Sequence, residues 1–585
     1  MKNLLIYLKD YKKESVTAPL FKMLEAIFEL IVPLVVARII DVGIVNNDKS
    51  YIFKMCGVLI LLAVIGLVCA ISAQFFAAKA AVGFATKLRS ALFFHIEKLS
   101  FADVDEIGTS TLIARMTSDI NQLQSGVNMV LRLFMRSPFV VFGAMIMAFT
   151  VNVKAALIFV VTIPLLSIVV FGVMLITIPL YKKVQAALDG VLGKTRENLS
   201  GARVIRAFNK EEQEIQEFNE SNRILTNLQL LVGRISALMN PLTLIIVNAA
   251  TILIIWVGAK EVYSGIISQG EVVALVSYMS QILVELVKLA NLIILITKAV
   301  ACGNRVADVL KREPSIQERT EDPGMERDTI LAENIPMVEF QNVAMRYGKS
   351  EEEALSNISF SAERGQTIGI IGGTGSGKSS LVHLIPRFYD VSKGSVRIEG
   401  VDVRDYSLVQ LREKIGIVPQ KAVLFHGTIE ENLRWGKADA TEEELWKAIA
   451  LAQAEDVVNG KEKGLSHMVE QGGKNLSGGQ RQRLTIARAL VKDPDILILD
   501  DSASALDFAT DARLRKALQS IAGEKTIFIV SQRTSSIQFA DKIIVLDDGE
   551  AVGMGTHAQL LESCEVYKEI YDSQFKQEEG GNANE

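Results

Sequence analysis

Apolar residues dominate the first half of the chain and form long runs. Six of these runs reach the length of about 20 residues that a helix needs to cross a bilayer, and they lie near residues 17–40, 55–78, 130–151, 155–179, 236–258 and 271–297. The connections at 79–129 and 180–235 are long, polar and free of proline, whereas the others are short. This pattern predicts an all-α membrane domain over residues 1–312, with helices that continue out of the bilayer on one side.

The pattern changes after residue 312. Residues 313–335 are charged, contain proline and glycine and lack apolar periodicity, which predicts a linker. Over residues 336–575, short apolar runs alternate with helical patterns, as in an α/β domain. Residues 576–585 have the composition of a disordered tail. The predicted fold is a six-helix transmembrane domain followed by an α/β nucleotide-binding domain of the P-loop type.

Composition agrees with a membrane part joined to a soluble part. The 585 residues are 49% hydrophobic and still 22% charged, and the mean hydropathy is +0.28. A net charge of −5 gives no electrostatic case for a nucleic-acid partner. The four cysteines lack paired spacing, so neither a disulfide framework nor a zinc site is expected.

Polar residues interrupt the first and sixth apolar runs. Lys22, Glu25 and Glu29 share one helical face, and so do Gln281, Glu285, Lys288 and Asn291. Such residues cost free energy in lipid and should face protein or water. They either line a substrate cavity or pair with one another. The candidate cavity residues are Glu25, Glu29, Gln281, Glu285 and Lys288.

The segment "TIGIIGGTGSGKSSL" is a phosphate-binding loop between a strand and a helix. Its glycines let backbone N–H groups close around phosphates, and the helix N-terminus adds positive potential. Lys378 reaches the β- and γ-phosphates, and the Ser379 hydroxyl ligates Mg²⁺. We expect ATP to bind the stretch Gly372, Gly373, Thr374, Gly375, Ser376, Gly377, Lys378, Ser379 and Ser380.

Two further segments extend this site. "DILILDD" is a buried strand that ends in Asp500, and an acid in that place completes the Mg²⁺ shell. In "NLSGGQRQRLTIARAL", a second glycine-rich turn precedes a helix and comprises Ser477, Gly478, Gly479 and Gln480. One domain has only one γ-phosphate to hold, so the second turn is expected to serve the nucleotide of another subunit.

The order "GGTGSGKSS", "IGIVPQKAVLFHGTIEENL", "LSGGQ", "LILDDSASALD" and "IVSQRTSS" resembles that of ATP-binding-cassette (ABC) nucleotide domains. With six preceding spans, almost the whole chain resembles a half-transporter of the ABC exporter family. The resemblance implies a dimer in which two ATP molecules lie between the phosphate loop of one half and the signature turn of the other. It also implies that Tyr347 stacks on adenine, that Gln420 contacts Mg²⁺ and couples to the membrane part, and that Asp507 communicates across the dimer.

The two long connections also resemble family features. Residues 101–124 and 196–213 match regions whose short transverse helices dock on the nucleotide domains. The resemblance implies that the second docks on the partner's domain. Residues 469–473, "VEQGG", stand where such a contact is expected.

Two positions depart from the family pattern, and both concern hydrolysis. Asp501 occupies the place of the family's hydrolytic glutamate, with a carboxylate one methylene shorter. Gln532 replaces the family's switch histidine and cannot carry a proton. Together with Lys378 they form the expected catalytic set, and they predict a site that binds ATP tightly and hydrolyses it slowly, because a general base must reach the attacking water.

These features resemble the degenerate-site subunit of heterodimeric bacterial multidrug-type exporters. The expected partner is a second half-transporter with intact Glu and His, and the expected cargo is an amphiphilic drug, lipid or peptide. The expected location is the cell membrane, with both termini and the nucleotide domain in the cytoplasm. The alternatives are a homodimeric exporter with two slow sites and an ATP-gated membrane protein that does not pump.

Overall fold

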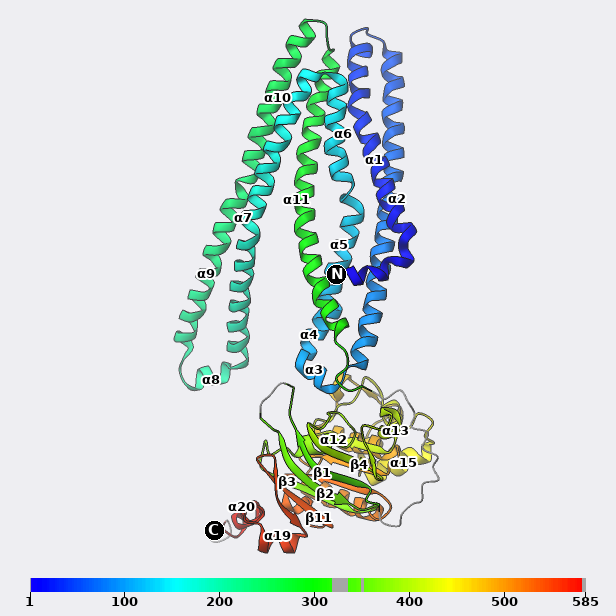
Figure 1. Cartoon of the computed structure of the whole chain (residues 1–585), viewed down its shortest axis with the longest axis vertical. Coiled ribbons are helices and arrows are strands. Elements are labelled where there is room, and N and C mark those ends of the chain that lie inside the picture. The colour runs from blue at the N-terminus through cyan, green and yellow to red at the C-terminus, as the bar shows by residue number, and fades with distance from the viewer. Residues whose placement is uncertain (1, 318–334, 349–351, 581–585) are drawn as a thin grey trace. The chain divides into compact units, whose positions relative to one another are not determined.

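The computed structural model describes residues 2–317, 335–348 and 352–580. The chain divides into two compact units (Figure 1). The first contains residues 1–97 and 109–312, and the second contains residues 98–108 and 313–585. The fold therefore places a short segment of the first long connection, 98–108, with the C-terminal unit.

The first unit consists of long helices. Helix α2, Lys49–Lys98, has 50 residues, so it is roughly 75 Å long, more than twice the hydrocarbon thickness of a bilayer. Among the described residues, five helical stretches are long and apolar enough to cross a membrane: Lys49–Lys98, Thr109–Val151, Val153–Ser200, Glu211–Tyr263 and Gln269–Lys311. As predicted, the helices continue beyond the length that a bilayer requires.

The first predicted span, residues 17–40, differs from the other five. It lies in α1, Lys12–Arg38, and runs into a π-helical turn, Ile39–Ile44. The segment is helical, but Lys22, Glu25 and Glu29 interrupt its apolar length. Its crossing of the membrane therefore stays a prediction.

The remaining helices of the first unit form pairs joined by short turns. Figure 1 shows α7 and α9 side by side with the short α8 at their tip. A two-residue turn separates α5 from α6, and Pro138 in the first turn of α6 lacks the N–H that a continuous helix would need there. The bounds are η1 Lys2–Tyr11, α4 Thr109–Ala114, η3 Arg115–Asp119, α5 Ile120–Leu133, α6 Arg136–Val151, α7 Val153–Ser200, α8 Ala202–Ala207, α9 Glu211–Ala237, α10 Met239–Tyr263 and α11 Gln269–Lys311.

The second unit is an α/β domain with three sheets. A six-stranded sheet has the order β12-β11-β3-β10-β9-β6, and all its neighbours are parallel except β12. An antiparallel sheet has the order β2-β1-β4-β5, and β7 pairs with β8. The strands are β1 Val338–Met345, β2 Leu355–Ala362, β3 Thr367–Gly372, β4 Lys393–Ile398, β5 Val401–Asp402, β6 Ile415–Val418, β7 Gly427–Thr428, β8 Met468–Val469, β9 Ile496–Asp500, β10 Thr526–Val530, β11 Lys542–Asp547 and β12 Glu550–Gly555.

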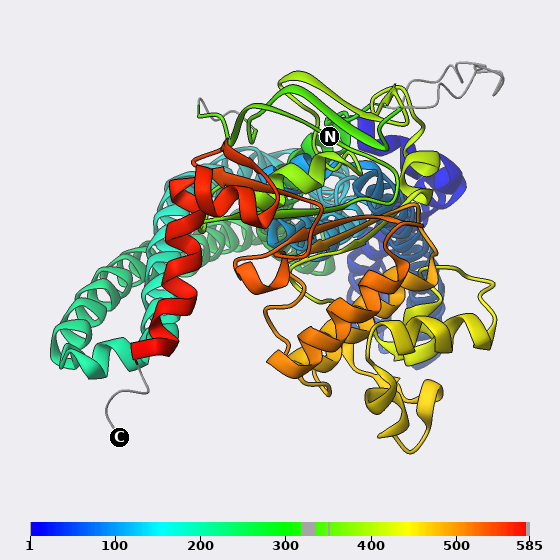
Figure 2. The same ribbon diagram turned by 90° about the horizontal axis from the view of Figure 1, so that it is seen from below.

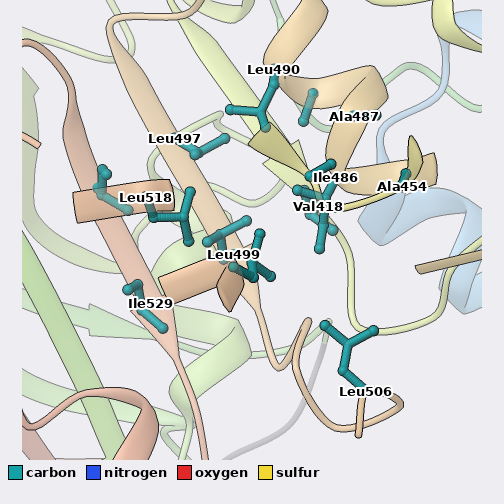
Figure 3. Packing of buried hydrophobic residues seen from close by; sticks show 14 of the residues in the cluster. Val418, Ala454, Ile486, Ala487, Leu490, Leu497, Leu499, Leu506, Leu518 and Ile529 are labelled. Atoms are coloured by element: carbon teal, nitrogen blue, oxygen red, sulfur yellow. The ribbon is translucent and has the colours of Figure 1, made fainter. Parts of the chain in front are cut away.

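Helices pack on the parallel sheet through apolar side chains. Figure 3 shows Leu497 and Leu499 of β9 among Ile486 and Leu490 of α17 and Leu518 of α18. Strands β3, β9 and β10 are buried along their whole length, which explains their continuous apolar sequences. The helices of this unit are α3 Phe101–Ile107, α12 Lys378–Leu384, α13 Leu408–Glu413, α14 Ile429–Leu433, α15 Glu442–Leu451, α16 Glu455–Asn459, η4 Gly464–Ser466, η5 Gln471–Gly473, α17 Gly478–Val491, α18 Phe508–Ile521, η6 Thr534–Ser536, α19 His557–Ser563 and α20 Glu565–Gly580.

The predicted linker and tail meet the structure only in part. Most of the linker, residues 318–334, lies outside the described residues. Helix α20, red in Figure 2, runs to Gly580, so residues 576–580 are helical rather than part of a disordered tail. The Lys, Gln and Glu residues there are good helix formers, which allows α20 to continue. Residues 581–585 lie outside the described residues.

Candidate nucleotide site

The phosphate loop connects β3 to α12. Gly375 and Gly377 have φ values of +87° and +90°, which side chains other than glycine rarely adopt. A Cβ atom at Gly377 would also approach the carbonyl oxygen of Ala354 to 2.8 Å. The two glycines therefore permit both the backbone conformation and the close packing of this loop.

Lys378 is buried inside the loop. Its Nζ donates hydrogen bonds to the carbonyl oxygens of Gly372, at 2.9 Å, and Gly373, at 2.5 Å. Burial lowers the pKa of the Lys378 ammonium, while the carboxylates of Asp501 and Asp500 oppose that shift. The cation thus lies at the centre of the loop, where the chemistry suits phosphate oxygens.

Asp500 at the end of β9 lies close to Ser379 after β3, because only β10 stands between these two strands. Val530 of β10 pairs with both Ile370 and Asp500. The Ser379 Oγ donates a 2.9 Å hydrogen bond to the Asp500 carboxylate. Burial raises the pKa of Asp500 and nearby Asp501 raises it further, whereas Ser379 and the cationic neighbours lower it.

The oxygen donors at this point fit Mg²⁺, which prefers hydroxyl, carboxylate and phosphate oxygens. Among the described residues no cluster of three or more His, Cys, Asp or Glu side chains could hold a metal by itself. Ser379, Asp500 and Gln420 would hold the ion together with the phosphates of the nucleotide. When bound, the ion would neutralise charge on the β- and γ-phosphates.

Asp501 and Gln532 face the same open pocket, which has a volume of about 260 Å³. The Gln420 Nε2 donates a 3.3 Å hydrogen bond to the Asp501 carboxylate. The pocket residues are Tyr347, Ala354, Thr374, Gly375, Gly377, Lys378, Ser379, Ser380, Gln420, Asp500, Asp501, Val530 and Gln532. The structure thus brings both positions that depart from the family pattern to the predicted nucleotide site.

Tyr347 borders this pocket. Its hydroxyl lies 2.7 Å from the Ser380 Oγ, and its ring meets the Tyr389 ring edge to face at 5.2 Å. The Tyr347 side chain is 42% exposed. An exposed ring at the pocket edge offers a surface on which a nucleobase can stack.

The signature turn lies at the start of α17. The Ser477 Oγ accepts a hydrogen bond from Gln480 N, and the Gln480 Oε1 accepts one from Ser477 N. This capping box holds the exposed Ser477 and Gly478 in a fixed turn. In the part of the chain that the structure describes, no residue of 477–480 lines the 260 Å³ pocket. The two predicted phosphate-binding turns are therefore separate in one chain.

Asp507 begins α18, and its carboxylate accepts a hydrogen bond from Thr510 N at 3.1 Å. Hydrogen bonds from the Thr510 side chain and from Thr510 N lower the pKa of Asp507. Asp507 is exposed, so it is available to a second subunit, and the contact seen here is that of a helix N-cap.

The charged residues of the membrane domain pair with one another. Arg136 donates 2.6 Å hydrogen bonds to Glu29 and to Glu285. Glu285 also accepts hydrogen bonds from Ser137 and Lys288, each at 2.8 Å. Lys22 pairs with Glu25 at 2.5 Å, while a buried oxygen of Gln281 has no partner among the described residues. Mutual pairing is thus present, and a role in lining a cavity stays a prediction.

Arg136 is the member of this network that the sequence did not single out. It stands in the third apolar run, and an arginine there requires a carboxylate partner. Its charge was the signal, but sequence alone does not show that Glu29 and Glu285 share it.

Helix α3 belongs to the first of the two predicted docking regions and packs within the C-terminal unit. The Phe101 and Phe388 rings lie 4.4 Å apart, and the Tyr389 hydroxyl donates a 2.6 Å hydrogen bond to Asp105. Phe388 and Tyr389 follow α12 closely in sequence. These contacts hold α3, which belongs to the first long connection, against the residues that follow α12.

These features define a multi-helix membrane protein with a P-loop nucleotide-binding domain. The family described as ABC transporter transmembrane region matches residues 16–286, and the family described as ABC transporter matches residues 355–504. The chain belongs to the ABC transporter family. It is a multi-pass membrane transporter with an ABC-type ATPase domain.

Similar proteins agree along nearly the whole chain. The ABC transporter ATP-binding protein YfiB of Bacillus subtilis is 36% identical, with 99% of each chain covered. The ATP-dependent lipid A-core flippase of Desulfotalea psychrophila is 34% identical, over 83% of this chain and 84% of the flippase. The structure of a bacterial Atm1-family ABC exporter with ATP bound has the same fold, with a TM-score of 0.76 at 23% identity and 96% and 98% coverage.

Proposed function

We propose that this chain is one half of a heterodimeric ATP-driven exporter, and that its own phosphate loop holds ATP while hydrolysing it slowly. The observation that carries the proposal is that Asp501, which the family resemblance aligns with the catalytic base, lines the same pocket as Lys378. Its carboxylate is one methylene shorter than glutamate and is hydrogen-bonded to Gln420. A base that falls short of the attacking water loses rate steeply.

Gln532 supports the same conclusion. Gln532 lines the same pocket as Asp501, and its amide can donate a hydrogen bond to a γ-phosphate. A neutral amide cannot carry the proton that an imidazole in this place would carry. The pocket therefore retains the groups that bind ATP and Mg²⁺, and it lacks two groups that support turnover.

The signature turn supports an exchange between two chains. Ser477, Gly478 and Gly479 are held in a capped turn that lies outside this chain's own pocket. In the proposed dimer they complete the partner's site, where an intact glutamate and histidine hydrolyse ATP. The retained ATP at Lys378 keeps the two nucleotide domains in contact between cycles.

The proposed cargo is amphiphilic: a drug, a lipid or a peptide that leaves the cytoplasm or the inner leaflet. A relative that is named as a lipid A-core flippase supports this class. The proposed location is the bacterial cell membrane, with both termini and the nucleotide domain in the cytoplasm. The proposed organisation is a membrane domain over 1–312, a linker over 313–335 and a nucleotide domain that begins at residue 336.

The test is ATP hydrolysis by the full chain purified alone in lipid nanodiscs, beside Lys378→Ala. We expect tight Mg-ATP binding to the chain, loss of that binding in Lys378→Ala, and negligible turnover. Turnover of about 1 per second or faster that Lys378→Ala abolishes would instead identify a homodimeric exporter. Copurification of the chain from its native membranes should recover a second ABC half, with hydrolysis restored in the pair.

A further inference from the structure

The C-terminal helix α20 reaches back to the segment that carries Gln532. The Gln574 Nε2 donates a 2.7 Å hydrogen bond to the Gln532 carbonyl oxygen. The Gln574 Oε1 accepts hydrogen bonds from Thr534 N and from the Thr534 Oγ1, each at 2.9 Å. One side-chain amide thus holds the backbone at both ends of a three-residue segment.

This segment is a direct extension of the nucleotide pocket. Strand β10 ends at Val530, whose carbonyl oxygen accepts a 3.0 Å hydrogen bond from Asp501 N, and Ser531 N donates to the carbonyl oxygen of Ile370 in β3. Two residues after the strand, the Gln532 side chain lines the pocket. A shift of the backbone at Gln532 would therefore move the amide relative to a bound γ-phosphate.

Other contacts leave Gln574 a distinct role. The Arg515 guanidinium of α18 donates to the Ser535 carbonyl oxygen, and Arg533 N donates to Ser531 Oγ at 2.9 Å. Among the hydrogen bonds of the described residues, the one that the Gln532 carbonyl oxygen accepts comes from Gln574. Thr534 is fully buried, so its N–H and hydroxyl need a protein partner, and Gln574 supplies it.

We propose that Gln574 is a positioning residue that fixes the Gln532–Thr534 backbone so that the Gln532 amide faces the γ-phosphate. This inference rests on the proposed function insofar as the site holds ATP through Gln532. A backbone that is already fixed reduces the ordering that ATP binding must otherwise impose. ADP has no γ-phosphate, so the effect is specific to ATP.

The test measures Kd for Mg-ATP and Mg-ADP on the full chain in nanodiscs, at low temperature, for wild type and variants. Gln574→Ala should weaken ATP binding roughly five- to tenfold, the scale of one lost hydrogen bond, with ADP binding unchanged. In the Gln532→Ala background, Gln574→Ala should not change the ratio of the two Kd values. Gln574→Glu keeps the acceptor for Thr534 but turns the donor into a carboxylate oxygen that repels the Gln532 carbonyl oxygen, so it should weaken ATP binding at least as much as Gln574→Ala.

The matched control is Gln559→Ala in α19. Gln559 also accepts a hydrogen bond from a backbone N–H, that of Thr556, at 2.9 Å, but that contact is part of the helix cap of α19 and lies outside the Gln532–Thr534 segment. Gln559→Ala should lower the melting temperature without changing the ATP-to-ADP preference. An equal loss of ATP and ADP affinity in Gln574→Ala, or the same change of preference in the Gln532→Ala background, would overturn the proposal. ATP turnover by wild type would contradict the proposed slow site instead, so the two failures are distinguishable.

Discussion

Replacing Asp501 with glutamate tests whether the length of one side chain limits hydrolysis at this site. The substitution adds one methylene, which moves the carboxylate forward by about 1.5 Å. At present the Asp501 carboxylate accepts a 3.3 Å hydrogen bond from Gln420, and both side chains line the pocket. We expect the longer side chain to reach further into this pocket, where the phosphates are proposed to bind.

The expected gain follows from the geometry of general-base catalysis. A base within hydrogen-bond reach of the attacking water contributes about 10²- to 10⁴-fold in rate, and a misplacement of about 1 Å costs about 10²-fold. We therefore expect Asp501→Glu to raise hydrolysis at the Lys378 site at least about 100-fold, or about 2.7 kcal/mol of barrier. Gln532 remains, so the rate should stay below that of a site with both glutamate and histidine.

Photolabelling with azido-ATP after vanadate trapping can assign the hydrolysis to one phosphate loop, because trapping requires turnover. In the native pair, wild type should be labelled on the partner's chain. Asp501→Glu should add label to this chain, and Asp501→Glu with Lys378→Ala should lose it again. Asp501→Asn is the matched control, since it keeps the length of the wild-type side chain and removes its charge.

Two results would refute this reasoning. Strong vanadate-dependent labelling of the wild-type chain at Lys378 would mean that Asp501 already acts as an efficient base. No gain in Asp501→Glu, despite unchanged ATP affinity, would mean that the position of the carboxylate does not limit the rate.

Two further predictions concern stability. Glu285→Gln should destabilise the protein by about 3–5 kcal/mol, because it leaves Arg136 buried with one fewer carboxylate. The control Glu29→Gln should cost about 1 kcal/mol or less, because the Glu29 side chain is 43% exposed. Equal losses of unfolding free energy in SDS–lipid titrations would contradict this prediction. Asp103→Asn should cost about 2 kcal/mol at pH 7: burial acts to raise the pKa of Asp103, but hydrogen bonds from Ser315 and Ser100 outweigh it, and the net shift is downward. Because the pKa is depressed, the ionised Asp103 stabilises the fold above the usual Asp range, and this stabilisation is lost as pH falls through the folded-state pKa. The melting temperatures of wild type and Asp103→Asn should therefore converge in acid. A difference in melting temperature that stays constant with pH would refute this reasoning.

The class of protein and the chemistry of the phosphate loop can be predicted from the amino-acid sequence alone. Local signals suffice for both, because apolar runs report membrane helices and the loop from Gly372 to Ser379 is contiguous. The strand that ends at Asp500 can also be predicted from the sequence, since a strand buried on both faces has a continuous apolar sequence. The C-terminal boundary differs from the prediction, because α20 continues to Gly580, into residues predicted as a disordered tail.

Which distant residues come into contact depends on how the elements pack. The parallel order of β3, β10 and β9 places Ser379, Asp500 and Gln532 at one edge, and no local pattern encodes that order. The Arg136 pairs with Glu29 and Glu285 span 107 and 149 positions, and Gln574 lies 42 positions beyond the carbonyl that it holds. Sequence patterns report which face of an element is apolar, whereas the partners of a buried polar group depend on how separate elements pack, and that is a property of the whole fold.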